Sequence, residues 1–186
     1  AICFHFAQVV AFHLPALKTE LQVRKTDAFA MAAPLMSPPA ERLDIPFADT
    51  VLPAYLRVPA DRDGPVPGIL LVPGLDSTKE DFATVMDIAV ARGLAVLAFD
   101  GPGQGEAHPG LLLGPDYEAC ISSAFEAMAA RPEVDGSRIG TIGRSLGRGS
   151  ADQGHGGVRR GLGFERLADH AAADPRRFRV GDRRRR

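Results

Sequence analysis

The spacing of hydrophobic and polar residues changes character along the chain. Apolar residues at roughly helical spacing predict one or two short helices within residues 1–30: Phe4, Val9, Val10, Leu14 and Leu17. The Pro-rich stretch 33–39 predicts an extended linker, because prolines end helices and restrict the preceding residue. Beyond it the period becomes two over residues 43–47 and 51–58, which predicts an antiparallel pair of strands.

Three short continuous apolar runs follow. Residues 68–72, 94–99 and 138–143 are typical of strands buried on both faces of a parallel sheet. Residues 78–92 and 116–130 lie between these runs and have helical character, with Gly93 as the predicted stop of the first helix. Strands that alternate with helices predict an α/β fold with a parallel sheet and right-handed crossovers.

The strongest chemical signal lies at the end of the third run. That strand leads into Gly143-Arg144-Ser145-Leu146-Gly147, a G-x-S-x-G sequence. The two glycines allow the sharp strand-to-helix turn that lifts a serine hydroxyl above a sheet. Ser145 is therefore the candidate nucleophile, and a Gly-rich turn with a serine helix cap is the structural alternative.

The loop after the first run is a candidate for the oxyanion hole. An acyl-transfer serine needs backbone donors for the developing oxyanion. One would be the N–H of Leu146, and the other the N–H of Leu75, in the loop from residue 73 to 77. The alternative is an ordinary loop with Asp76 or Ser77 as the N-cap of the next helix.

The loop after the second run is rich in glycine but does not match a nucleotide site. The sequence Asp100-Gly101-Pro102-Gly103-Gln104-Gly105-Glu106 lacks the third glycine of G-x-G-x-x-G and the Lys-Ser/Thr pair of a phosphate loop. A tight turn at the carboxyl edge of the sheet is the better interpretation. Glu106 and His108 are either pocket residues there or solvated loop residues.

Several stretches of residues 29–147 together resemble the α/β-hydrolase fold. More narrowly, they resemble the 2,6-dihydroxypseudooxynicotine hydrolase-like group and its relatives among fermentation–respiration-switch esterases. The stretches that carry the resemblance are 32–35, 38–42, 45–47, 52–57, 72–80, 98–106 and 143–147. The resemblance implies Ser145 as the nucleophile, with the Leu75 and Leu146 amides as the oxyanion hole.

The resemblance also implies an organisation and a substrate class. Residues 1–40 would be a remnant of a helical cap with its linker, and 41–147 the N-terminal half of the hydrolase domain. The substrate would be a small molecule with an ester or a ketone-flanked C–C bond, without a cofactor or metal. Asp76, Glu106, His108 and Arg144 are candidate pocket residues. A homodimer is compatible with the family but has no support in these residues.

The resemblance ends at residue 147, where the composition changes. Residues 1–147 carry 11 basic and 18 acidic residues, whereas 148–186 carry 11 arginines and 5 acidic residues. The triad of this fold continues after the serine with an acid and then a histidine. Only 41 residues follow Ser145, too few for the strand–helix units of roughly 30 residues that would hold them. We therefore expect a domain incomplete at both ends, with 148–186 as an aberrant, out-of-frame tail.

Two other interpretations of the tail remain open. Asp152 or Asp169 could pair with His155 or His170 as a displaced acid and base, although their closeness to the serine turn disfavours that geometry. The tail could also be an Arg/Gly-rich arm that binds nucleic acid, which is the less favoured alternative because it has no RGG-type repeat.

Composition narrows the class of protein. A hydrophobic content of 45% and a charged content of 24% are typical of a globular protein. Cys3 and Cys120 are too few for a disulfide scaffold and match no metal-ligand spacing. The apolar first 17 residues are interrupted by polar residues and proline, which argues against a secretory signal or a membrane span. We expect a soluble cytoplasmic protein.

The sequence thus predicts a serine hydrolase, with a serine peptidase of the same fold as the nearest alternative. The alternative from another class is a non-catalytic fragment or a basic-tailed nucleic-acid-binding protein. Because the triad imidazole is missing from the pattern, we expect the 186-residue chain to show no serine-dependent turnover of p-nitrophenyl acetate.

Overall fold

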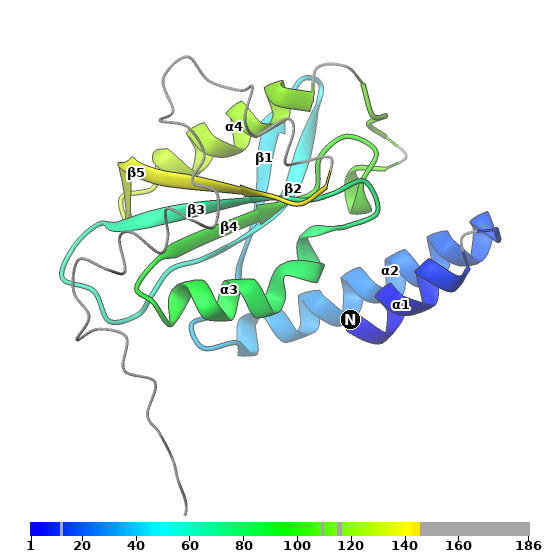
Figure 1. Cartoon of the computed structure of the whole chain (residues 1–186), viewed down its shortest axis with the longest axis horizontal. Coiled ribbons are helices and arrows are strands. Elements are labelled where there is room, and N and C mark those ends of the chain that lie inside the picture. Colours follow the sequence, from blue (N-terminus) through cyan, green and yellow to red (C-terminus); the bar gives the residue numbers. More distant parts are fainter. Residues whose placement is uncertain (12, 109, 115–116, 146–186) are drawn as a thin grey trace, which may run out of the picture.

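A mixed β-sheet forms the centre of the molecule. The computed structural model describes residues 1–145 except residues 12, 109, 115 and 116. Within them the strand order is β1-β2-β4-β3-β5 (Figure 1). The strands are β1 (Glu41–Phe47), β2 (Thr50–Arg57), β3 (Val66–Val72), β4 (Ala95–Phe99) and β5 (Val134–Gly143). Strand β3 runs parallel to β4 and β5, whereas β1 with β2 and β2 with β4 are antiparallel.

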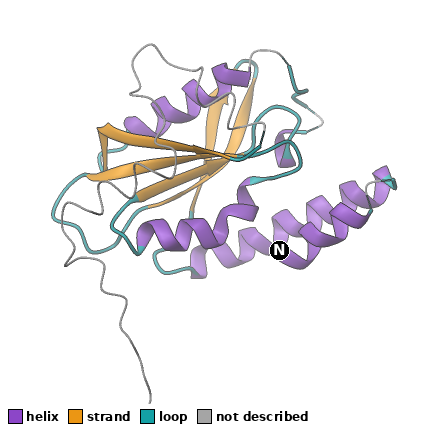
Figure 2. Ribbon diagram, in the orientation of Figure 1, coloured by secondary structure: helices purple, strands orange, loops and turns teal. Residues whose placement is uncertain are grey.

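Helices cover both faces of this sheet (Figure 2). Helix α4 (Tyr117–Ala129) covers one face, and α3 (Ala83–Val90) covers the other. Helices α1 (Ile2–Val10) and α2 (Pro15–Ala32) pack together as a hairpin on the α3 side (Figure 1). Three short 3₁₀ helices complete the described elements: η1 (Ala33–Leu35), η2 (Lys79–Phe82) and η3 (Gly105–Ala107).

Side chains of the central strands alternate between the two faces. In β3, Leu70 and Val72 pack towards α4, whereas Ile69 and Leu71 pack towards α3. This is the alternation that the pleat imposes on a strand buried on both sides. The α4 core includes Ile121, Ala124 and Met128, and the α3 core includes Phe29 of α2 together with Phe82 and Met86. The predicted hairpin, parallel strands and covering helices are confirmed.

Three local predictions need correction. Residues 78–92 do not form one helix. A capping box of Thr78 and Asp81 starts the 3₁₀ helix η2, and the α-helix α3 follows it and ends at Val90. Thr78 is therefore the N-cap, rather than Asp76 or Ser77. Residues 33–35 form a 3₁₀ turn instead of extended chain, since proline is tolerated in a first turn.

Strand β5 is longer and less buried than predicted. It begins at Val134 rather than at residue 138, and most of its residues are partly exposed. The physical reason is its place at the edge of the described sheet, where β3 is its paired neighbour. None of the helices in the described part of the chain has the length and hydropathy needed to cross a bilayer.

Some predictions concern residues outside the described part. Leu146 lies there, as does the whole predicted tail 148–186. The alternative acid and base residues of that tail are therefore not placed: Asp152, His155, Asp169 and His170.

Candidate active site

The site lies at the carboxyl edge of the parallel strands. Strand β3 lies between β4 and β5, and the connections through α3 and α4 cross opposite faces of the sheet. Because these connections leave neighbouring strands towards opposite faces, a crevice forms beyond the carboxyl ends of the strands. Ligands bind at such crevices in open α/β sheets. The loops after β3, β4 and β5 all enter this region, so the topology gathers the candidate residues.

Ser145 stands on a sharp turn directly after β5. Its backbone is in the left-handed region, with φ of 52°. A non-glycine residue in that region is strained by about 1–3 kcal/mol, and such residues are concentrated at functional sites. The Arg144 N–H donates to the Val72 carbonyl at 3.0 Å and ties the turn to β3. Both Arg144 and Ser145 are exposed.

Gly74 lets the loop after β3 pack against this turn. A Cβ at Gly74 would lie 2.9 Å from the Arg144 carbonyl oxygen and 3.0 Å from the Ser145 Cβ. Any side chain at this position would therefore displace one of the two segments. The next residue, Leu75, is 53% exposed. Its N–H makes no hydrogen bond within the described part of the chain, which leaves a free backbone donor next to the serine turn.

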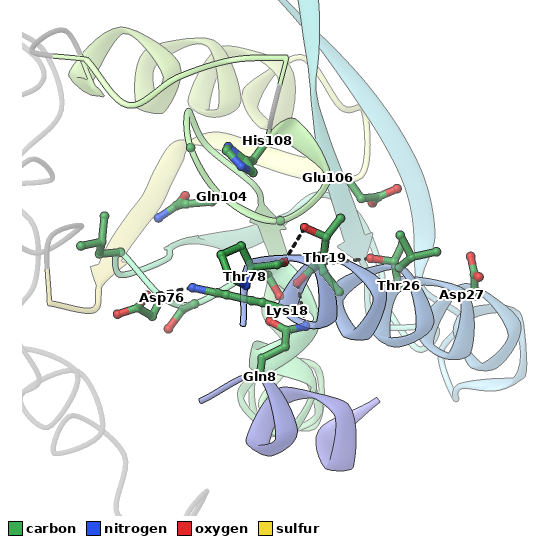
Figure 3. Close-up of a pocket in the computed structure, with 17 residues that line it drawn as sticks. Gln8, Lys18, Thr19, Thr26, Asp27, Asp76, Thr78, Gln104, Glu106 and His108 are labelled. Atoms are coloured by element: carbon green, nitrogen blue, oxygen red, sulfur yellow. Dashed lines mark hydrogen bonds and ion pairs between the residues drawn. The ribbon is translucent and has the colours of Figure 1, made fainter. Parts of the chain in front are cut away.

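A cavity of about 760 Å³ separates the helical hairpin from the loops after β3 and β4 (Figure 3). Asp76, Glu106 and His108 line it together with Leu75, whereas Ser145 and Arg144 lie outside its lining. The hairpin contributes a second, polar wall, which includes Gln8, Lys18, Thr19, Gln22 and Thr26. Lys18 reaches towards Asp76, with Nζ 3.7 Å from Oδ1.

A buried charge cluster, defined here as Lys79, Glu80 and Asp100 with the exposed Glu106 at its edge, lies next to the cavity. The ammonium of Lys79 is 2.7 Å from Asp100 Oδ2 and 2.6 Å from Glu80 Oε1, and it also pairs with Glu106. The N–H groups of Lys79 and Glu106 donate to the Asp100 carboxylate at 2.8 and 3.0 Å. Burial lowers the pKa of Lys79, but the three carboxylates raise it above its ordinary value.

The three carboxylates of this cluster could in principle hold a cation. Their oxygens lie within 4.8 Å of one another. The Lys79 ammonium already pairs with all three, so the protein supplies the positive charge itself. Arg42 also binds Glu106 at 2.9 Å. Glu106 therefore borders the cavity while its carboxylate is held in ion pairs.

The hairpin is fastened to the segment that follows the Leu75 loop. Lys25 of α2 is buried and donates to the Thr78 hydroxyl at 2.7 Å, with Asp81 Oδ1 at 3.5 Å. His5 of α1 places Nδ1 3.1 Å from the same carboxylate. Thr78 is the N-cap of η2 and directly follows the loop that contains Leu75. The hairpin is therefore anchored immediately next to that loop.

Sequence reasoning missed Lys18, Lys25, Lys79 and Gln104 as site residues. One available signal was amino-acid usage, because only three of the 22 basic residues are lysine. All three lie at the cavity or in the buried contacts beside it. In a chain that otherwise uses arginine or histidine for positive charge, each of the three lysines lies in this region.

Comparison with known proteins gives a consistent result. The profile of the family described as "Esterase FrsA-like" matches residues 4–153. The chain is 37% identical over 147 residues to 2,6-dihydropseudooxynicotine hydrolase of Paenarthrobacter nicotinovorans, which covers 79% of this chain and 39% of that protein. It is 36% identical over 131 residues to the hydrolyase poxO of Penicillium oxalicum, covering 65% of this chain and 31% of the relative.

A solved structure agrees with the sequence match. The crystal structure of the 2,6-dihydroxy-pseudo-oxynicotine hydrolase superposes with a TM-score of 0.77 at 34% identity. The superposition covers 82% of this chain and 43% of that one. The present chain thus spans about two fifths of the length of this relative, and the predicted half of an α/β-hydrolase sheet is confirmed.

Proposed function

Because the chain belongs to the esterase FrsA-like family of α/β-hydrolases, we propose that Ser145 is the nucleophile of a serine hydrolase. The observation that carries the proposal is the strained turn of Ser145, packed against Gly74. That contact brings the serine turn next to the free N–H of Leu75. A nucleophile elbow beside a backbone donor is what acyl transfer requires.

The proposed chemistry is attack on a carbonyl carbon. The Ser145 hydroxyl forms a bond to that carbon, and the carbonyl oxygen becomes an oxyanion that accepts from the N–H groups of Leu75 and Leu146. Each such donor contributes about 10²–10³-fold to the rate. A histidine must take the serine proton. None of the described histidines is hydrogen-bonded to Ser145.

The cavity supports a small-molecule substrate. Its volume of about 760 Å³ is within the range of roughly 300–1,000 Å³ of small-ligand sites. The hairpin closes one side of it, an arrangement that favours a compact ester or ketone-flanked substrate over the extended polypeptide of a peptidase. We place Asp76, Glu106 and His108 in the substrate pocket, and Arg144 at its exposed edge.

We also propose that the protein acts in the cytoplasm. Cys3 and Cys120 are both free thiols, as expected in the reducing cytoplasm. A small-molecule carbonyl compound is the proposed partner, in preference to nucleic acid.

Labelling with a fluorophosphonate probe tests the nucleophile. We expect slow, stoichiometric labelling of the 186-residue chain over hours, since an oxyanion hole alone retains about 10³–10⁴-fold rate enhancement after loss of a triad member. Ser145→Ala should abolish the labelling. Ser123→Ala on α4, which removes another hydroxyl, should leave it unchanged. Labelling that survives in Ser145→Ala would overturn the assignment, and an unlabelled chain would favour a non-catalytic fragment.

Turnover tests a separate part of the proposal. We expect no Ser145-dependent hydrolysis of p-nitrophenyl acetate by this chain, because proton transfer needs the triad base. Hydrolysis that Ser145→Ala abolishes would support the nucleophile but would contradict the expected inactivity.

A further inference from the structure

We propose that Gln104 is a positioning residue of the oxyanion hole, whose side-chain amide fixes the peptide unit that presents the Leu75 N–H. The inference rests on the proposed function, because it concerns the oxyanion donor of the same site. Gln104 follows β4, far from β3 in sequence, and is only 2% exposed.

The contact is made to the carbonyl of Gly74. Gln104 Nε2 donates to the Gly74 oxygen at 2.7 Å, and the Ser77 N–H donates to the same oxygen at 3.0 Å. The Gly74 carbonyl and the Leu75 N–H belong to one planar trans peptide unit, so they point in opposite directions. A bond that fixes the carbonyl therefore fixes the direction of the N–H.

The same bond also affects the strength of the donor. A carbonyl that accepts two hydrogen bonds is polarised, and polarisation through a peptide strengthens its N–H as a donor. Gln104 thereby acts on an oxyanion donor that no substitution at Leu75 other than proline can remove, since the donor is a backbone N–H.

The orientation of the Gln104 amide is set by two further contacts. Its Oε1 accepts from the Gly101 N–H at 2.9 Å and from the Tyr117 hydroxyl at 2.7 Å. Both partners are donors here, so Oε1 must face them and Nε2 must face Gly74. Burial raises the pKa of Tyr117 above its ordinary value, which keeps the hydroxyl protonated as a donor.

The glycines of the loop make room for this arrangement. A Cβ at Gly101 would lie 2.6 Å from the Tyr117 hydroxyl and 3.0 Å from Gln104 Oε1. A Cβ at Gly105 would collide with the Asp100 carboxylate. The glycine-rich loop after β4 thus serves to pack Gln104, Tyr117 and Asp100 closely.

Two variants separate positioning from folding. Gln104→Met keeps the side-chain length but donates nothing to Gly74, and Tyr117→Phe removes only the hydroxyl that orients the amide. We expect Ser145 labelling by a fluorophosphonate to slow by about 10- to 100-fold in Gln104→Met. This slowing does not exceed the one expected when a direct oxyanion donor is removed. Tyr117→Phe should slow it less. The control variant is Met128→Ala, which weakens the apolar core under α4 by removing a buried side chain that packs against Gly68, away from the Gly74 carbonyl.

A spectroscopic readout makes the test independent of reactivity. The ¹³C signal of the Gly74 carbonyl and the ¹⁵N signal of the Leu75 amide should both move in Gln104→Met and stay in place in Met128→Ala. Unchanged labelling in a folded Gln104→Met protein would overturn this inference and leave the proposed function intact. An unlabelled parent chain would overturn the proposed function, and the two NMR signals would then decide the positioning role: movement supports it, and no movement overturns it.

Discussion

The two faces of the sheet are held together by different physical means. On the α4 face lies an apolar core that includes Leu70, Ile121, Ala124 and Met128. The opposite face has an apolar core under α3, but beside it lies the buried charge cluster around Lys79. Within the described residues, the cavity and the hairpin lie on the second face.

The difference shows which interactions stabilise the domain and which shape the site. Apolar burial contributes stability without strong directionality. Buried ion pairs add little net stability, because desolvation offsets their attraction, but losing one partner is strongly destabilising. We infer that the charge cluster holds the loops after β3 and β4 in register, whereas the α4 face supplies the stabilising core.

The largest expected effect is on the charged face. Lys79→Met should lower the free energy of unfolding by about 3–5 kcal/mol, since it leaves a buried carboxylate at Asp100 without its cation. Urea unfolding at neutral pH measures this loss. Because an unpaired buried carboxyl has a raised pKa, the variant should become more stable as pH falls towards 4. A variant as stable as the parent at pH 7 would show that the cluster is incidental.

On the apolar face, Met128→Ala should cost about 2–5 kcal/mol through the cavity that it leaves. Met128 is fully buried, and its methyl group packs over Gly68 at the start of β3. Urea unfolding again measures the loss, and its size should not depend on pH between about 4 and 8. A loss of stability that depends on pH would mean that the two faces are electrostatically coupled. It would contradict the difference between an apolar face and a charged face.

Glu80 gives a smaller, pH-dependent effect. Burial raises its pKa, but Lys79 and Thr78 lower it more, so the folded value is below the ordinary one. The stability that ionised Glu80 contributes is therefore present above the unfolded pKa of about 4.3 and is lost as pH falls through the folded value. The difference in urea midpoint between the parent and Glu80→Gln should be largest at pH 7 and shrink in acid. A difference that grows in acid would reverse the assigned sign.

The smallest effect concerns the two thiols. Burial raises the pKa of Cys120 to about 12, and the thiolate is the reactive form. Iodoacetamide at pH 8 should therefore modify exposed Cys3 and leave Cys120 intact, as measured by peptide mass spectrometry. Urea-unfolded protein, in which both thiols react, is the control. Rapid modification of native Cys120 would show that the α4 face opens readily.

Periodicity was sufficient to predict the sheet and its covering helices. The runs around Leu70 and Leu97 are apolar at consecutive positions because both of their faces are covered. The serine turn was also visible, since its glycines and strand context lie within a few residues of Ser145. These features depend on local sequence.

The polar contacts of the site were not predictable in the same way. Gln104 and Gly74 are separated by 30 positions, and Lys25 and Thr78 by 53. No periodicity encodes such pairs, and a lysine on a helix is ordinarily assigned to solvent. The start of η2 was misplaced for a related reason: Ser77 and Thr78 are both good caps, and the Asp81 carboxylate selects Thr78.

The three lysines have a practical consequence for anyone who handles the protein. Lys25 and Lys79 are buried, whereas the Lys18 side chain is 46% exposed and lines the cavity. Reagents that acylate lysine amines, or resins that couple through them, would attach at Lys18 in the lining of the proposed substrate pocket. A loss of ligand binding after such immobilisation would then report a blocked pocket, and coupling through Cys3 offers an attachment point on α1 instead.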